Sequence, residues 1–348
     1  MQSELLTKRK SLSLQNGFII SNTGEEKTFL AMKEVEEILS HTEDDVIIVD
    51  VMHNFSKKEI EKLGGQIIEI CPSVNSSSPV CINPLDADVW NNDDGYVYDK
   101  FDLFVTVFEK LSGASLTAYS RSFLDYALRT MYGDIRNSRE KFIPVLSDLV
   151  DYLRPKDENG SKVLETLINK CDCFNHQTTL ELEEHRLNSI TLCDFGRFSE
   201  IGILFILEYI RSVIKHNHNN GKDTWVYICD FDFLFHETNR SGYIETLWKR
   251  GRMLGGIYTA LILKDKPKLP MGLMRMYQGN TSVKYYDNDA LSPLLYNSFY
   301  FVIAKPQTDD EIFVKNLDIK NVDEKLFNHE GKFHDSICII NNEIIPIN

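Results

Sequence analysis

The chain has 348 residues, 43% of them hydrophobic, so it is long enough to bury one large core or two smaller ones. Its formal net charge of −14 opposes strong, unaided binding to nucleic acid, which depends on basic surface. No apolar run approaches the roughly 20 residues that span a bilayer, and the N-terminus lacks the apolar centre of a signal peptide. We therefore expect a cytoplasmic protein that reaches the inner face of a membrane only through partners.

Strands and helices alternate at both ends of the chain, with a helical block between them. The first predicted strands are residues 18–20, 45–50 and 66–70, and the first predicted helices are 29–39 and 57–63. Four helical segments follow and predict an all-helical insertion over 91–173. Further strands are predicted over 187–194, 225–230, 257–263, 300–304 and 336–346, with helices over 201–214 and 242–254. The alternation predicts an α/β core of residues 1–90 and 174–348, with a mostly parallel sheet and helices on both faces.

The turn before the first of these helices has the outline of a phosphate-binding loop. A working loop reads G-x-x-x-x-G-K-[ST], where glycines let backbone N–H groups wrap the phosphates and the lysine neutralises them. Lys27 and Thr28 are present here, whereas Ser21 and Glu26 occupy the two glycine positions. The misplaced carboxylate and the lost glycine together predict nucleotide binding weakened by about three decades. The alternative interpretation is an ordinary strand, turn and helix.

A second group of candidate residues ends the strand over 225–230. In P-loop ATPases such a strand ends in Asp-Glu, where the Asp holds Mg²⁺ and the Glu activates the attacking water. Cys229 and Asp230 stand at these positions, and a thiol is a poor ligand for Mg²⁺. In the other register Asp230 is the metal acid and Phe231 stands at the base position. The alternative is a core strand that ends in an acid at a turn.

Arg250 and Arg252 close a predicted helix shortly before Gly255. One of them could reach a phosphate in a neighbouring subunit, as an arginine finger does. The alternative is a basic helix end that complements the helix dipole.

Cysteine and histidine give no metal site. The seven cysteines are scattered and most lie in apolar surroundings, which is typical of reduced thiols in a cytoplasmic protein. Cys171 and Cys173 have the wrong spacing for a zinc knuckle. His216 and His218 lie in a polar run that we predict to be a solvated turn.

In their order, these segments resemble the ATPase domain of the conjugative-transfer ATPases of type IV secretion systems. The resemblance spans nearly the whole chain and implies a RecA-like P-loop fold interrupted by an all-helical subdomain. The segments that carry it are 9–12, 16–20, 23–24, 27–29, 49–50, 62–65, 83–86, 174–176, 225–228, 247–250, 252–256 and 344–346. The chain also begins where the family's ATPase domain begins.

The resemblance implies ATP and Mg²⁺ as cofactors and other subunits of a secretion or conjugation machine as partners, in a homo- or hetero-oligomer. It implies nucleotide binding by Thr23, Gly24, Lys27 and Thr28, and catalytic roles for Asp230, Arg250 and Arg252. Family roles do not carry over to Ser21, Glu26, Cys229 or Leu263, the last of which stands where a sensor glutamine is expected. We therefore expect a degenerate copy with weak or no ATP hydrolysis, and doubtful binding of ATP and Mg²⁺. The alternative is an active ATPase with a divergent loop that powers DNA or protein transfer.

Overall fold

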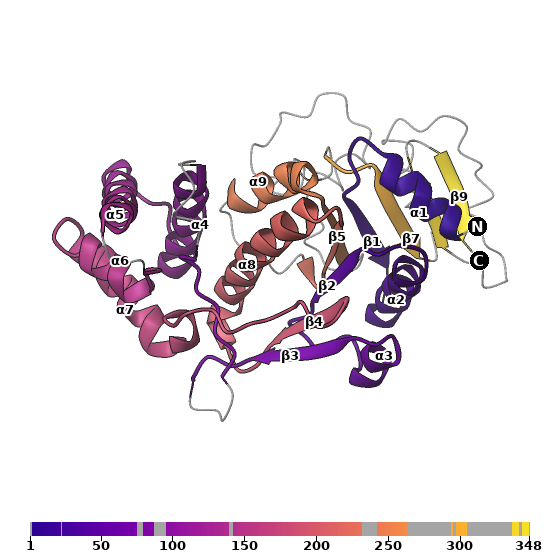
Figure 1. Cartoon of the computed structure of the whole chain (residues 1–348), viewed down its shortest axis with the longest axis horizontal. Helices are drawn as coiled ribbons and strands as arrows, with labels where there is room; N and C mark the ends of the chain where they lie inside the picture. The colour runs from indigo at the N-terminus through magenta and orange to yellow at the C-terminus, as the bar shows by residue number, and fades with distance from the viewer. Residues whose placement is uncertain are drawn as a thin grey trace.

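The computed structural model describes residues 2–21, 23–74, 79–86, 95–138, 142–231, 242–263, 294, 297–304, 336–340 and 343–347. Its strands form one sheet in the order β3-β4-β2-β5-β6-β1-β7-β8-β9 (Figure 1). The strands are β1 Gly17–Ser21, β2 Asp45–Val49, β3 Gln66–Ile70, β4 Leu187–Leu192, β5 Thr224–Ile228, β6 Gly256–Leu263, β7 Tyr300–Ala304, β8 Ser336–Ile340 and β9 Glu343–Ile347. All neighbours from β3 to β7 are parallel, and β8 and β9 add an antiparallel hairpin. The predicted mostly parallel sheet is confirmed.

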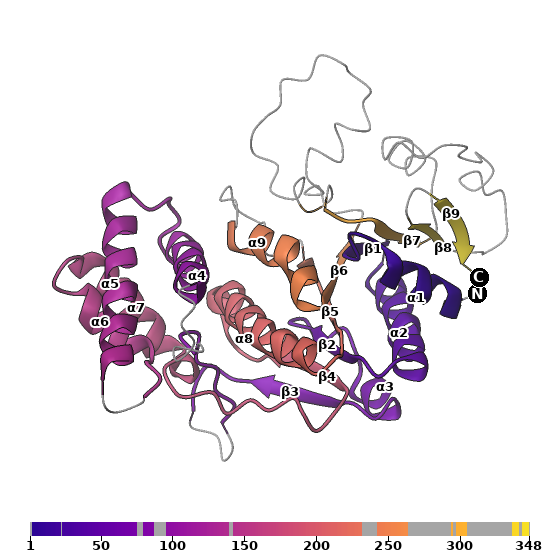
Figure 2. The ribbon, with the colours of Figure 1, turned by 45° about the horizontal axis from the view of Figure 1, so that its top comes forward.

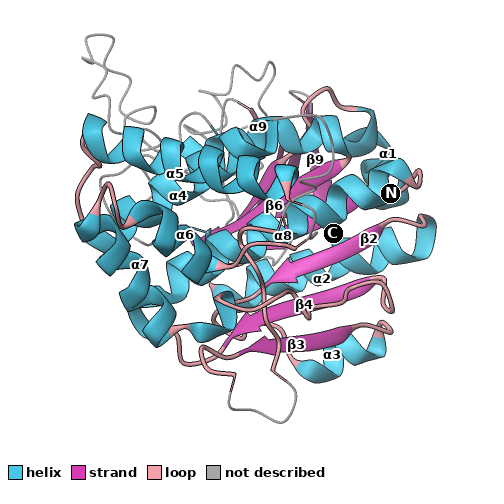
Figure 3. Cartoon of the chain, turned by 60° about the vertical axis from the view of Figure 1, so that its left-hand side comes forward, coloured by secondary structure: helices cyan, strands magenta, loops and turns pink. Residues whose placement is uncertain are grey.

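Helices cover both faces of this sheet, as the alternation predicted (Figure 3). One face carries α1 Gln2–Ser11, α2 Gly24–His41 and α3 Lys57–Lys62, and the other carries α8 Ser199–Asn219 and α9 Gly242–Gly251. Successive strand residues point to opposite faces. Ile19 therefore belongs to the core under α1 and α2, whereas Phe18 and Ile20 belong to the core under α8 and α9.

Four consecutive helices between β3 and β4 occupy the predicted helical block. They are α4 Gly95–Ser112, α5 Ala118–Asn137, α6 Leu146–Leu153 and α7 Glu158–Lys170, and they lie together at one end of the molecule (Figure 2). Thr117 caps α5 by accepting a hydrogen bond from the Ser120 N–H at 3.1 Å. The helical character of the block is confirmed, and the domain boundaries stay a prediction.

Three local predictions were wrong or incomplete. α1 was not predicted, because most of its residues are polar and its buried side chains include only two apolar ones, Leu5 and Leu6, beside the charged Arg9. His216 and His218 lie in the last turn of α8 and not in a loop. The helix expected from Phe29 begins at Gly24, which changes the candidate site. Within the described residues, no helix combines the length and apolar character needed to cross a bilayer.

Candidate functional site

The turn between β1 and α2 is short and closed by its own hydrogen bonds. The Ser21 hydroxyl donates to the Thr23 carbonyl at 2.5 Å. Thr23 is the N-cap of α2, and its hydroxyl accepts from the Glu26 N–H at 3.3 Å. Only residues 22 and 23 separate strand from helix. A wide loop that wraps phosphates does not form, since its expected residues make the first turn of α2.

Lys27 and Thr28 lie one turn inside α2, where both side chains are buried. The Thr28 hydroxyl donates to the Gly24 carbonyl at 2.9 Å, so it bonds the helix itself. The N–H groups of Lys27 and Thr28 lie beyond the first turn, where the helix uses them in its own bonds. Any anion at this helix end therefore meets fewer free N–H groups than in a phosphate-binding loop.

The ammonium of Lys27 is already paired with a carboxylate of the same chain. Lys27 Nζ lies 2.5 Å from Oδ1 of Asp230, just past the end of β5. The Lys27 side chain is 1% exposed and that of Asp230 is 14% exposed. The structure thus brings together the lysine and the acid that the sequence nominated separately, although 203 positions separate them.

Asn54 connects this ion pair to the end of β2. Its side-chain amide donates to Oδ2 of Asp230 at 2.8 Å and to Oδ1 of Asp50 at 2.9 Å. Asp50 also accepts from the backbone N–H groups of Asn54 and Phe55. Asp50 therefore holds the turn that follows β2 by accepting these hydrogen bonds. Both carboxylate oxygens of Asp230 already have a partner, Oδ1 in Lys27 and Oδ2 in Asn54. Asn54 was not predicted as a site residue, although a short amide side chain four residues after a strand-ending Asp is a recognisable turn signal.

Cys229, at the position expected for the metal acid, is buried under this network. Burial raises the pKa of its thiol, and the nearby carboxylates of Asp50 and Asp230 raise it further. A neutral thiol is a weaker ligand than a thiolate, and Mg²⁺ prefers oxygen. Among the described residues, no group of three or more His, Cys, Asp or Glu side chains is arranged to hold a metal ion.

Backbone strain gathers at the same edge of the sheet, where the parallel strands end. The described non-glycine residues with positive φ are His53 at 54°, Asp194 at 61° and Asp230 at 47°. They follow β2, β4 and β5, three neighbouring strands of the sheet. A non-glycine residue in this region costs about 1–2 kcal/mol, and such strain concentrates at functional sites.

The two candidate arginines are not brought to Lys27. Arg250 lies at the C-terminal end of α9, near the edge where strands begin, because the Asn16 amide ahead of β1 donates to the Trp248 carbonyl. Its guanidinium bonds Asp99 of α4 at 3.0 Å and is 64% exposed. Arg252 begins a short 3₁₀ turn after α9. A five-residue strand spans roughly 17 Å, so Arg250 and Lys27 lie at opposite edges of the sheet.

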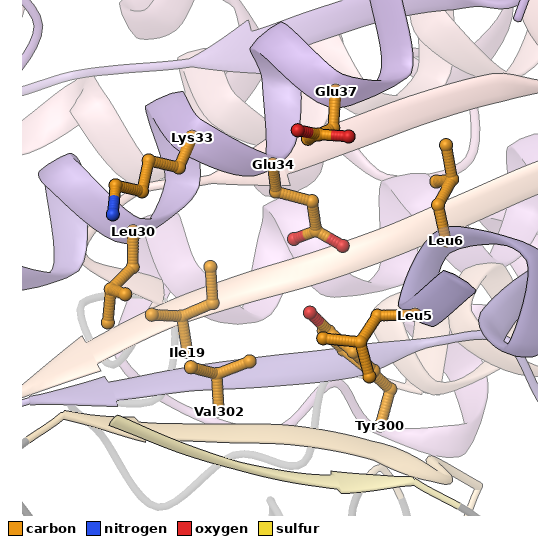
Figure 4. A pocket seen from close by; sticks show the side chains of 9 residues that line it. All are labelled: Leu5, Leu6, Ile19, Leu30, Lys33, Glu34, Glu37, Tyr300 and Val302. Carbon is orange, nitrogen blue, oxygen red and sulfur yellow. The ribbon is translucent and has the colours of Figure 1, made fainter. Parts of the chain in front are cut away.

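A separate pocket lies on the face of the sheet that α1 and α2 cover (Figure 4). Leu30 and Glu34 of α2 line it together with Tyr300 of β7, and the Glu34 side chain extends toward Tyr300. Its volume of about 50 Å³ holds a few water molecules, whereas ligand pockets measure about 300–1,000 Å³. This pocket is too small for a nucleotide.

Comparison with known proteins places the fold. No protein-family model matches the sequence, and no curated protein matches it significantly. The structure resembles VirB4 of Thermoanaerobacter pseudethanolicus with a TM-score of 0.67 and 15% identity, over 98% of this chain and 91% of that chain. It resembles the unbound bacterial conjugative coupling protein TrwBΔN70 with a TM-score of 0.53 and 13% identity, over 96% and 84% of the two chains. The chain therefore has the RecA-like P-loop α/β fold of VirB4 and TrwB, which confirms, for the fold, the resemblance predicted from the sequence.

Proposed function

We propose that this chain is a component of a conjugation or type IV secretion machine in which a P-loop ATPase fold has lost most of its nucleotide chemistry. It hydrolyses ATP weakly or not at all and contributes structure or docking. The observation that carries this proposal is the buried ion pair between Lys27 and Asp230.

The ion pair competes directly with a phosphate. An incoming phosphate must either displace Asp230 from Lys27 or lie beside its negative charge. Two like charges about 4 Å apart repel by about 4 kcal/mol at an effective dielectric of about 20. That energy corresponds to roughly three decades of affinity. Asn54 adds to the barrier, because Asp230 must also give up its second hydrogen bond before it can turn away.

The short turn after β1 supports the same conclusion. A cradle of backbone N–H groups would require the first turn of α2 to unwind, with loss of the Thr23 cap and of the Thr28 bond to Gly24. Loss of a helix cap alone costs about 1 kcal/mol. Cys229 supplies no oxygen ligand to a Mg²⁺ ion, so the metal does not offset the charge of Asp230.

The proteins that share this fold suggest the kind of partner that the chain has. VirB4 and the conjugative coupling protein TrwB share the fold, and this chain covers 98% and 96% of its own length in those matches. We assign it to assembly with other machine subunits on the cytoplasmic side of a membrane, as a homo-oligomer or beside an active relative. Its net charge of −14 opposes a direct role in holding DNA.

Thermal unfolding with and without millimolar MgATP tests the proposal. A ligand at 1,000 times its Kd stabilises by about 4 kcal/mol, which shifts Tm by several degrees. We expect no shift for the natural chain, and no recovery of turnover in Glu26→Gly. We expect Asp230→Asn to bind ATP more tightly, because it releases the Lys27 ammonium. Micromolar ATP binding by the natural chain, or hydrolysis that disappears in Lys27→Ala, contradicts the proposal.

One observation favours a second candidate function, an active ATPase with a divergent loop. The strained residues His53, Asp194 and Asp230 gather where the strands end, as expected of a working site. In that case MgATP releases Asp230 from Lys27, and steady-state phosphate release depends on both residues. Turnover that is abolished by Lys27→Ala and by Asp230→Asn, and retained in Lys33→Ala, supports this second function.

A further inference from the structure

Two cysteines stand side by side where the edge strand β3 and its neighbour β4 end. The strands are parallel, with Ile70 opposite Leu192, and Cys71 and Cys193 are the next residues of each. The ladder continues to this level, because the Cys193 N–H donates to the Ile70 carbonyl at 2.9 Å. Neighbouring strands lie about 4.8 Å apart, which falls within the Cα separations of about 4.4–6.8 Å that disulfides require.

Both thiols lie on the same face of the sheet. Ile70 and Leu192 point into the core under α8, and consecutive side chains alternate, so Cys71 and Cys193 point to the opposite face. Cys71 lies close enough to Cys193 to raise the pKa of the Cys193 thiol. Cys71 is exposed and Cys193 is partly exposed, so a small reagent reaches the pair from solvent.

The other five cysteines are buried, so the pair is chemically distinct. Burial raises the pKa of Cys171 to about 12 and that of Cys173 higher still, which suppresses their thiolates. Cys173 is the nearest competitor, since its N–H donates to the Pro72 carbonyl at 3.2 Å. Burial and the neighbouring Glu69 raise the pKa of Cys193. The exposed Cys71 is therefore the thiol that reacts first.

We propose that Cys71 and Cys193 are a modification site at which a hydroperoxide forms an intramolecular disulfide. The Cys71 thiolate attacks the peroxide, the O–O bond breaks, and Cys71 becomes a sulfenic acid as an alcohol or water leaves. The Cys193 thiol then attacks that sulfur, the S–S bond forms, and water leaves. Two thiols lose two electrons and the hydroperoxide gains them. The site is independent of nucleotide and of the proposed function.

The crosslink closes the part of the chain that contains the helical block. Residues 71 and 193 bracket α4 to α7, so a disulfide between them fastens both ends of this block at the sheet. A bridge across a long segment restricts the unfolded chain and stabilises the folded one. We therefore expect oxidation to raise Tm by roughly 5 °C or more and a reducing dithiol to reverse the rise.

Treatment of the reduced protein with stoichiometric hydrogen peroxide tests the proposal. Intact mass falls by the two hydrogens of one disulfide, the seven thiols titrated after denaturation become five, and peptide mapping joins Cys71 to Cys193. A Cys71–Cys173 crosslink, a disulfide-linked dimer, a terminal sulfinic acid on Cys71, or seven unchanged thiols each overturns the proposal.

Single variants treated with hydrogen peroxide distinguish this pair from the other cysteines. Cys71→Ser forms no disulfide and keeps its six remaining thiols. In Cys193→Ser, oxidation ends at a sulfenic acid on Cys71, which a dimedone probe traps. Cys338→Ala, at a buried position in β8, is the matched control and still forms the crosslink. Cys173→Ala also forms it, and loss of the crosslink in that variant contradicts the assignment.

Discussion

Lys100 of α4 and Glu208 of α8 form an ion pair away from water, with Nζ 2.6 Å from Oε1 and side chains 2% and 4% exposed. Arg211 bonds the same carboxylate at 2.8 Å, and the Tyr243 hydroxyl of α9 donates to its second oxygen. The carboxylate of Glu208 thus ties the helical block to the helices that cover the sheet. A buried charge that loses its only close counter-charge is strongly unfavourable.

Glu208→Gln tests this junction. The substitution removes the carboxylate that pairs with the buried Lys100 ammonium, and we expect it to lower the free energy of unfolding by about 3–5 kcal/mol. Replacing both residues, as Lys100→Met with Glu208→Leu, should restore much of the loss because neither charge of this ion pair remains, and Arg211 keeps Asp99 as its partner. Urea unfolding at neutral pH measures both. Glu158→Gln, in the exposed pair with Lys162, is the control and should leave stability unchanged.

The same carboxylate predicts a dependence of stability on pH. Burial opposes the charge of Glu208, but Lys100 and Arg211 together outweigh it and lower its pKa to about 2, from a reference value of 4.5. A lowered folded pKa gives stability that is complete above the unfolded pKa and lost as the pH falls toward the folded one. Between about pH 5 and pH 3, the natural chain should lose stability more steeply than Glu208→Gln. Urea unfolding midpoints of both proteins, measured across this pH range, test the prediction. Midpoints that fall in parallel for the natural chain and Glu208→Gln would contradict it.

Lys27 and Asp230 should respond unequally to substitution. Asp230→Asn leaves the 1%-exposed Lys27 without a counter-charge and should cost about 3 kcal/mol. Lys27→Met should cost less, because Asp230 keeps its bond from Asn54 and some contact with water. A double-mutant cycle by chemical denaturation gives the coupling between them. Equal losses of stability in the two single variants, with no coupling energy between them, would mean that the ion pair does not stabilise this site.

Gly17 should not tolerate a side chain. A Cβ there would lie 2.3 Å from the Tyr300 carbonyl oxygen of β7, which is paired with β1 at this level. We expect Gly17→Ala to destabilise by about 3 kcal/mol, because backbone of the sheet must move. Gly133→Ala in α5 meets nothing within 4 Å and should stabilise by about 1 kcal/mol through helix propensity. Thermal unfolding of the two alanine variants compares them directly.

Arg9 should not be replaceable by lysine. Its guanidinium is fully buried, pairs with Glu34 at 2.5 Å, donates to the Thr259 hydroxyl at 2.6 Å and lies 4.0 Å over the ring of Tyr300. Lysine keeps the charge but loses the planar, multiply bonded group, so we expect Arg9→Lys to cost about 2–3 kcal/mol. Lys8→Arg on the exposed side of α1 is the control and should leave the urea midpoint unchanged.

The order and type of most elements could be predicted because those signals are local. The strand β2 and the helix α8 follow from runs of apolar residues with the period of their own backbone. α1 escaped prediction since its decisive residue is Arg9, a charged side chain buried by partners far along the chain. The start of α2 also escaped, because the choice between loop and helix for residues 24–28 depends on what Lys27 meets in space.

The sequence by itself determined an α/β fold with a helical block, because the spacing of apolar residues within each short segment indicates whether that segment is a strand or a helix. It also supplied the lysine, the strand-ending acids and the cysteines. Only the tertiary structure decided that Lys27 meets Asp230, that Asn54 holds that acid in place, and that Cys71 stands beside Cys193. Those pairings depend on the order and register of strands, which long-range packing sets, and no local pattern encodes which strand ends become neighbours.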